Sequence, residues 1–412
     1  MPIASDANTI SVQQELTKDD CFRLLAAMHN TVATKGYSDL TIDFTSCSRA
    51  FSPEMLTICA RCLSYWRDGI DISIILPSDR RMKGLFINAN WAHLIDHRSY
   101  EASRYRGYTH AAAIRFSDAR EQHTAVDKIL DILLAAIAHF RRADIRYIEW
   151  IVNELTDNVM NHARSAIGGI AQVSNLRQRE QIELSVCDSG VGIPSTLRGT
   201  NTALRSDMEA LDAAIKEGVT RDKSFGQGNG LYGTWSISQK SGGQILIISG
   251  YASLVSSLRD GLHIRRENIP LNGTLVSARI GYSDKVDLSD SLTFGGKRHV
   301  PVDYIETHFD EDKDGNITFV IKKESESFGS RSAGEPVRRK LLNVIRALKG
   351  GRVMIDCADV ILVSSSYADE VFGKLFKEIG PMEFMKRIEF TNIVDTSKSL
   401  IDKAISQRMR GH

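Results

Sequence analysis

Apolar residues recur along residues 148–163, IEWIVNELTDNVMNHA, with the period of a helix. They follow the spacing i, i+3, i+4, i+7 and i+11, at Ile148, Ile151, Val152, Leu155 and Val159. This spacing places them on one helix face and predicts an amphipathic helix.

Three polar residues of the same stretch, Glu154, Asn158 and Asn161, follow the spacing i, i+4 and i+7. At about 100° per residue their side chains lie within about 60° of one another. A carboxylate can orient an attacking water, and an amide oxygen suits Mg²⁺. Taken alone, the pattern equally fits an ordinary amphipathic helix with a solvated polar face.

The first part of the chain alternates between two patterns. Helix-like periods cover 20–32 and 53–66, while 40–44 and 70–76 read as strands. Alternating strands and helices predict an α/β layer domain, which we place at residues 1–97. A basic and aromatic stretch, 98–124, follows without clear periodicity and is interpreted as a connector rather than as a nucleic-acid site.

The central part contains further strand-like runs and two glycine-rich turns. Strands are expected at 170–176, 181–186, 245–249, 262–265 and 274–280, the last after an Asn272-Gly273 turn. The second run leads into DSGVGIP, residues 188–194, in which glycines allow close backbone approach to a ligand. Asp188, at the end of this buried strand, is placed to accept a hydrogen bond from an exocyclic amine.

The segment 194–224 is long and mixed, which is typical of a lid or binding loop. It leads into FGQGNGLYG, residues 225–233, at the start of a helix. Such a loop offers backbone N–H groups to phosphate oxygens. The GxGxxG spacing there does not indicate a Rossmann site, because polar residues precede it instead of a strand.

The composition and charge of the chain argue against some classes of function. Fifty-two Lys and Arg balance 51 Asp and Glu, so no overall field attracts nucleic acid or an anionic membrane. The N-terminus lacks secretory-signal features, and the most apolar window, 129–140, is too short to span a bilayer, so a cytoplasmic location is expected. Cys59 and Cys62 form a lone CxxC, interpreted as buried thiols rather than a metal site.

Together, Glu154 and Asn158, DSGVGIP, GQGNGLYG and Gly273-Thr274 resemble the GHKL ATPases with the Bergerat nucleotide fold. The resemblance covers residues 125–282. It implies that Asn158 binds Mg²⁺ and that Glu154 acts as a general base for hydrolysis or serine-kinase chemistry. It also implies that Asp188 recognises adenine by accepting a hydrogen bond from its amine.

The same resemblance implies a set of further ATP-binding positions. Gly190 and Gly192 would shape the adenine pocket, and Thr274 would support the adenine through water. The phosphate loop would comprise Gly226, Gly228 and Gly230 with Leu231. His162 matches a basic or histidine position of the motif, whereas Asn161 has no assured role. His139 does not stand in a recognisable phosphoacceptor segment.

After an expected linker at 283–300, residues 301–412 again alternate helices and strands. The run RVMIDCADVILVSSSYADEVFGKL resembles STAS-like domains, which partner anti-sigma kinases in bacterial switches. The resemblance matches Ser365 or Ser366 to a phosphorylated serine; the alternative is a helix N-cap role for these hydroxyls. A similar Ile-Asp with a serine nine residues after the Asp, at Asp43 and Ser52, suggests a diverged STAS-like domain at the N-terminus.

The sequence therefore predicts an α/β protein, with an α+β sandwich as its central ATP-binding domain and a smaller α/β domain on either side. The expected function is a regulatory switch that binds and hydrolyses Mg²⁺-ATP, with lid closure over residues 194–224. A serine kinase of the anti-sigma type and a non-catalytic nucleotide sensor remain alternatives. A protein partner or homodimer is expected, and neither nucleic acid nor a membrane. The pathway stays open among transcription control, stress signalling and phage defence.

Overall fold

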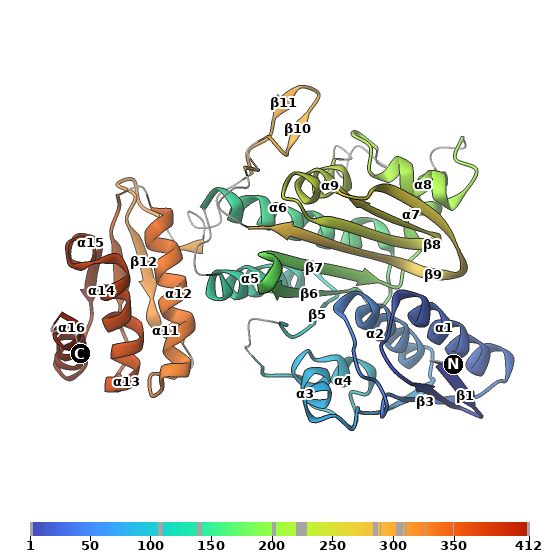
Figure 1. Ribbon diagram of the computed structural model, residues 1–412, viewed down its shortest axis with the longest axis horizontal. Helices are drawn as coiled ribbons and strands as arrows, with labels where there is room; N and C mark the ends of the chain where they lie inside the picture. The colour runs from blue at the N-terminus through green and yellow to red at the C-terminus, as the bar shows by residue number, and fades with distance from the viewer. Residues whose placement is uncertain are drawn as a thin grey trace. The chain divides into compact units, whose positions relative to one another are not determined.

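The computed structural model describes residues 3–105, 110–137, 142–199, 203–219, 229–282, 287–288, 290–301, 308–309, 311–325, 327–348 and 350–409. The chain divides into two compact units, one made of 1–129 and 150–300 and the other of 130–149 and 301–412 (Figure 1). The division falls within two helices, α5 (Ala119–Ala136) and α6 (Arg142–Asn158).

The first unit begins with a four-stranded sheet in the order β1-β2-β3-β4. Its strands are β1 (Ile3–Asp6), β2 (Thr9–Val12), β3 (Asp39–Asp43) and β4 (Asp71–Ile75). The first pair is antiparallel and the other two pairs are parallel. The connecting and following helices are α1 (Lys18–His29), which a π-helical turn extends to Thr34, α2 (Ser52–Arg67), α3 (Arg80–Asn88) and α4 (Trp91–Ile95).

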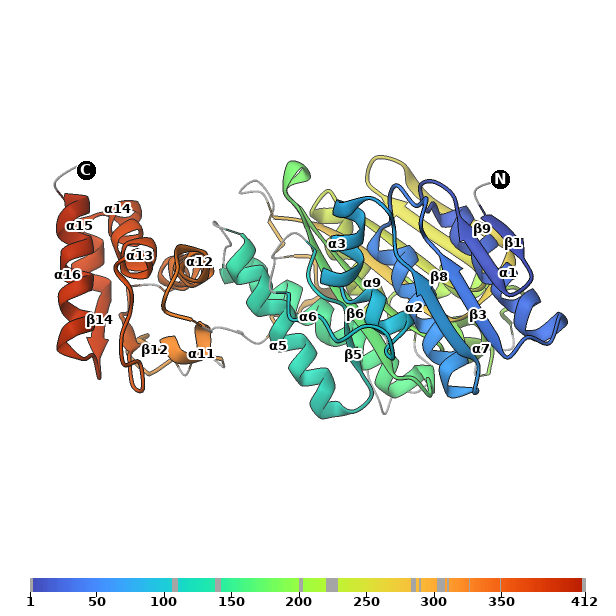
Figure 2. The ribbon, with the colours of Figure 1, turned by 90° about the horizontal axis from the view of Figure 1, so that it is seen from below.

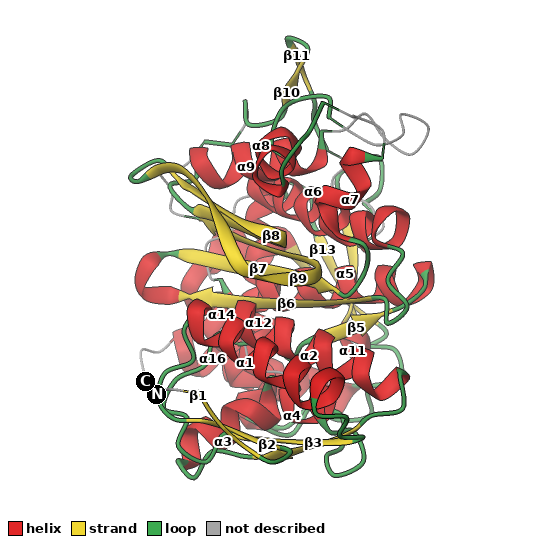
Figure 3. Cartoon of the chain, turned by 90° about the vertical axis from the view of Figure 1, so that its right-hand side faces the viewer, coloured by secondary structure: helices red, strands yellow, loops and turns green. Residues whose placement is uncertain are grey.

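A five-stranded antiparallel sheet forms the rest of this unit, in the order β5-β6-β7-β9-β8. Its strands are β5 (Ile114–Phe116), β6 (Gly169–Leu176), β7 (Gln181–Asp188), β8 (Gln244–Ser257) and β9 (Gly261–Gly281). Besides α5 and α6, its helices are α7 (Gly192–Arg198), α8 (Asp207–Ala214) and α9 (Gly230–Lys240). Figure 3 shows α6, α7 and α9 over one face of the sheet, and α1 and α2 over the other.

Helices α1 and α2 lie between the two sheets, so that residues 1–97 share one hydrophobic core with the five-stranded sheet. Cys59 and Cys62 of α2 are fully buried there, as is Cys187 of β7. Polar contacts join the same parts: the indole Nε1 of Trp91 donates to Gln172 Oε1 over 3.0 Å. The N-terminal segment therefore packs against the sheet instead of forming a core of its own.

Two stretches that the sequence assigned to connections contain strands. The expected connector 98–124 contains β5, which pairs with β6, and the start of α5. The expected linker 283–300 contains β10 (Thr293–Phe294) and β11 (Lys297–Arg298), which pair as an antiparallel hairpin.

The prediction of a turn at Asn272-Gly273 was wrong, because both residues lie inside the continuous strand β9. Gly273 has φ +103°, and a Cβ there would collide with the main chain of Asp188. Glycine at this position thus allows β9 to approach the end of β7 closely. The pairing of β9 with β8 also shifts register nearby. A local Asn-Gly signal cannot distinguish this use from a hairpin turn.

The second unit has a parallel three-stranded sheet in the order β12-β13-β14. Its strands are β12 (Ile317–Val320), β13 (Val353–Asp356) and β14 (Ile388–Thr391). Its helices are α11 (Ile321–Glu324), α12 (Arg331–Ala347), α13 (Ser365–Ala368), α14 (Lys374–Ile379), α15 (Pro381–Arg387) and α16 (Asp395–Met409), and a π-helical turn joins α13 to α14 (Figure 2). Crossover helices between parallel strands confirm the expected α/β fold class.

In the second unit, a buried lysine of α12 forms ion pairs with α5 and α11. Lys340 of α12 is 4% exposed, and its ammonium group lies 2.6 Å from Asp131 Oδ1 and also contacts Glu324. The two carboxylates raise the pKa of Lys340 above its ordinary value although burial opposes this. Asp131 belongs to the C-terminal part of α5, so this helix contributes to the core that contains the parallel sheet.

Candidate functional site

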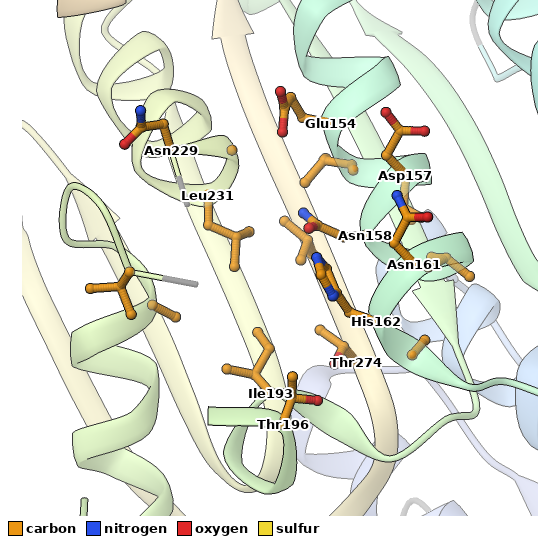
Figure 4. Close-up of a pocket in the computed structure, with 18 of the residues that line it drawn as sticks. Glu154, Asp157, Asn158, Asn161, His162, Ile193, Thr196, Asn229, Leu231 and Thr274 are labelled. Carbon is orange, nitrogen blue, oxygen red and sulfur yellow. The ribbon is translucent and has the colours of Figure 1, made fainter. Parts of the chain in front are cut away.

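A cavity of about 360 Å³ lies in the first unit, between the five-stranded sheet and helices α6, α7 and α9 (Figure 4). It brings together seven residues that the sequence selected: Glu154, Asn158, Asp188, Gly192, Gly230, Leu231 and Thr274. Gly190 is not part of the wall but donates its N–H to Asp188. Gly226 and Gly228 lie outside the described residues. The expected lining thus converges from segments more than 100 residues apart.

The helix with the acidic and amide residues changes its geometry inside the cavity. It was expected to run to Ala163, but regular α-helix ends at Asn158, and a π-helical turn covers Val159–Ala163 before Arg164 adopts φ +51°. Asn161 and His162, which belong to this π-helical turn, also line the cavity. Figure 4 shows Glu154, Asn158 and His162 directed into it.

The carboxyl group of Glu154 lies in the cavity wall, and its pKa is shifted toward neutrality. Burial, assisted by the nearby charge of Asp157, raises the pKa of Glu154 to about 7. A Cβ at Gly230 would collide with Glu154 Oε2, so that a larger residue there would displace the Glu154 carboxylate. A carboxyl group with a pKa near the working pH is suited to general-base catalysis.

Asn158 presents an unsatisfied polar atom at the cavity. Its Nδ2 is buried and has no hydrogen-bond partner among the described residues. Buried amides are normally paired, so this one fits a missing ligand group. Rotation about the terminal bond exchanges the amide N and O, which lets the oxygen face a cation. No cluster of three or more His, Cys, Asp or Glu side chains for a metal occurs in the described part of the chain. Mg²⁺ that is shared with ligand phosphates needs no such cluster.

Asp188 is held at the end of β7 by backbone donors. Its side chain is 5% exposed, and burial raises the pKa of Asp188 to about 6 although N–H groups of Gly190 and Thr274 oppose the shift. The Gly190 N–H donates to Oδ1 over 2.7 Å. The rigid carboxylate is therefore placed to accept a hydrogen bond from a ligand N–H donor.

Ser249 of β8 connects the elements at the same end of the cavity, and no sequence pattern had marked this residue. Its buried hydroxyl accepts from the Ile193 N–H over 2.9 Å, donates to the Gly273 carbonyl over 2.8 Å and lies 3.1 Å from Thr274 Oγ1. The hydroxyl thus ties α7 to β9 beside Asp188.

The described part of the expected lid, residues 194–224, is folded. Helix α8 begins with a capping box of Ser206 and Glu209. Asp207 accepts from Arg198 of α7 over 2.5 Å and from the Tyr251 N–H of β8 over 2.7 Å. These contacts anchor α7 and α8 to the sheet.

An aromatic wall closes the end of the cavity near Glu154. Trp150 precedes Glu154 by one helical turn, and its ring centroid lies 6.3 Å from that of Phe294 and 6.5 Å from that of His299. Phe294 and His299 belong to the expected linker, and the sequence did not identify them as lining residues.

The three serines at 364–366, which were expected to open a helix in the C-terminal part of the chain, lie at the start of α13. Ser364 is the N-cap, because its hydroxyl accepts from the Tyr367 N–H over 3.0 Å. Ser365 and Ser366 follow in the first turn and are exposed. The expected N-cap role of Ser365 or Ser366 was therefore wrong, because Ser364 caps the helix. His139 lies outside the described residues.

Comparison with known families identifies one part of the chain. Residues 333–398 match the model of a STAS-like domain of unknown function (DUF4325). This match confirms the C-terminal resemblance, whereas the central resemblance to GHKL ATPases stays a prediction. No curated protein matches the chain. Among the described residues no helix is both long and apolar enough to cross a membrane.

Proposed function

We propose that this protein is an ATP-dependent regulatory switch, in which the first unit binds and hydrolyses Mg²⁺-ATP and the STAS-like domain responds. The observation that supports it most is the single cavity that joins Glu154, Asn158, Asp188 and the start of α9. The cavity contains a carboxylate that can accept from an amine, an amide with an unsatisfied polar atom, and a helix N-terminus. These three groups suit an adenine ring, a cation and phosphates, respectively.

In this proposal each residue has a separate task. Asp188 accepts the exocyclic amine of adenine, and Thr274 supports the ring beside it. Mg²⁺ would neutralise phosphate charge, with Asn158 as its protein ligand. The N–H groups of Gly230 and Leu231 at the start of α9 donate hydrogen bonds to phosphate oxygens. Glu154, ionised above pH 7, orients a water and takes its proton during attack on the terminal phosphate.

Two alternatives remain within the same site. The terminal phosphate could pass to a serine hydroxyl instead of water, and Ser365 and Ser366 are exposed in a domain of the STAS-like type. A non-catalytic sensor would use the same binding residues without turnover. A protein partner, or a second copy of the chain, is proposed as the receiver of the nucleotide signal.

Equilibrium dialysis of ATP with and without Mg²⁺ tests the binding step. We expect Mg²⁺ to tighten binding to the wild-type protein and Asn158→Ala to remove most of that gain. Asn153→Ala is the matched control, because Asn153 is on the same helix but is not part of the cavity wall. The absence of ATP binding by the wild-type protein would refute the proposed function.

A further inference from the structure

The cavity wall has an unusual charge for a nucleotide site. Among the described lining residues there are three carboxylates, Glu154, Asp157 and Asp188, but neither lysine nor arginine. A nucleoside triphosphate is strongly anionic, and close like charges are unfavourable in a partly buried site. Only two side chains of the described wall, His162 and His299, can carry a positive charge.

The two histidines occupy different parts of the cavity. His162 follows Asn158 on the π-helical turn, and Figure 4 shows it between Glu154 at one end and Thr274 at the other. His299 instead contacts the ring of Trp150, which precedes Glu154 by one turn. His299 therefore lies at the end that contains Glu154 and the start of α9, away from Asp188.

The segment that carries His299 is fixed in place. The His299 N–H donates to the Leu292 carbonyl over 2.7 Å and closes the β10–β11 hairpin. Leu292 is fully buried, and a Cβ at Gly233 of α9 would lie 2.8 Å from its Cδ2. Lys240 of α9 donates to the Asp290 carbonyl over 2.5 Å. These contacts attach the hairpin to the helix whose N-terminus faces the cavity.

Aromatic packing sets the position of the imidazole. The ring centroids of Phe294 and His299 are 6.2 Å apart, and Phe294 also lies 6.1 Å from Tyr232 of α9. The His299 side chain is nevertheless exposed, and it is part of the cavity wall. An imidazole packed against Trp150, one helical turn from Glu154, is placed to donate to an anion that enters this end.

We propose that His299 binds the terminal phosphate of the nucleotide and so distinguishes nucleoside triphosphate from diphosphate. This inference rests on the proposed function, because it uses the same cavity and the same direction of the nucleotide. A charge-assisted hydrogen bond contributes about 1.5–3 kcal/mol. Since about 1.4 kcal/mol corresponds to tenfold in affinity, His299 contributes tenfold or more to ATP binding and little to ADP binding.

The test compares the dissociation constants of ATP and ADP for the wild-type protein, His299→Ala and His299→Lys. We expect alanine to weaken ATP binding at least tenfold with ADP binding unchanged, and lysine, which restores a cation, to recover most of the ATP affinity. His263→Ala is the control, because His263 is an exposed residue of β9 outside the cavity wall.

The outcomes separate the two proposals. Wild-type protein that binds neither nucleotide would overturn both the proposed function and the role of His299. Wild-type protein that binds ATP, together with an alanine variant that keeps the same ratio of ATP to ADP affinity, would overturn the role of His299 alone. Equal weakening of ATP and ADP by both substitutions would indicate lost packing against Phe294 and would also overturn it.

Discussion

Replacing Asp188 by asparagine is expected to stabilise the free protein while weakening nucleotide binding. The carboxyl group is 5% exposed, and burial raises the pKa of Asp188 from 3.8 to about 6. One pKa unit corresponds to about 1.4 kcal/mol. At neutral pH the buried charge therefore lowers the free energy of unfolding by about 3 kcal/mol relative to a neutral group.

The effect has a defined pH window. Because the folded-state pKa lies above the unfolded value, the penalty is absent below pH 3.8, grows up to about pH 6 and stays constant above it. Asparagine keeps one oxygen for the Gly190 N–H but loses the acceptor for Thr274, which costs about 1 kcal/mol. We expect a net gain of about 2 kcal/mol at pH 7.5 and a loss of about 1 kcal/mol below pH 4.

Urea unfolding followed by tryptophan fluorescence measures this difference. All four tryptophans, at 66, 91, 150 and 235, belong to the first unit, so the signal reports the unit that contains Asp188. Asp68→Asn is the control, because Asp68 is exposed beside Arg67. A variant that is less stable than the wild type at pH 7.5, or a difference that does not change with pH, would refute the reasoning. If ATP binds as proposed, the new amide would face the adenine amine and weaken binding about 100-fold.

Two further predictions concern Glu154 and Lys340. Since the pKa of Glu154 is raised to about 7, phosphate release should increase as pH rises from 6 to 8, and a wild-type rate that stays flat across this range would contradict a general-base role. Lys340→Ala leaves two carboxylates beside a buried site and should cost about 3–5 kcal/mol in scanning calorimetry. Lys322→Ala removes an exposed pair with Asp359 and should cost less than about 1 kcal/mol; equal losses for the two variants would argue against burial as the cause.

Local patterns were enough to select much of the cavity. Glu154 and Asn158 were visible because a helix repeats every 3.6 residues, and Asp188 because a strand ends at a glycine turn. Gly273 was selected together with Thr274, but its physical role was misread as a turn. Its conformation follows from the approach of β9 to Asp188, which depends on strand pairing rather than on neighbouring residues.

The contacts that the sequence could not reveal are tertiary. Ser249 contacts α7 and β9 through one hydroxyl, and no periodicity marks a serine in a strand. Phe294 and His299 reach the cavity from a polar stretch without periodic pattern. Ser64 of α2 lies 2.7 Å, hydroxyl to hydroxyl, from Ser189 beside Asp188, a contact across 125 residues that joins the N-terminal segment to the cavity.

The most direct test of the account follows the labelled γ-phosphate of ATP with the wild-type protein and Glu154→Ala. We predict free phosphate from the wild type, and a variant that still binds ATP but releases none. Label transferred to the protein at Ser365 or Ser366 would instead identify a kinase. Phosphate release by Glu154→Ala at the wild-type rate, or intact ATP with the wild-type protein, would contradict the proposed hydrolysis by Glu154.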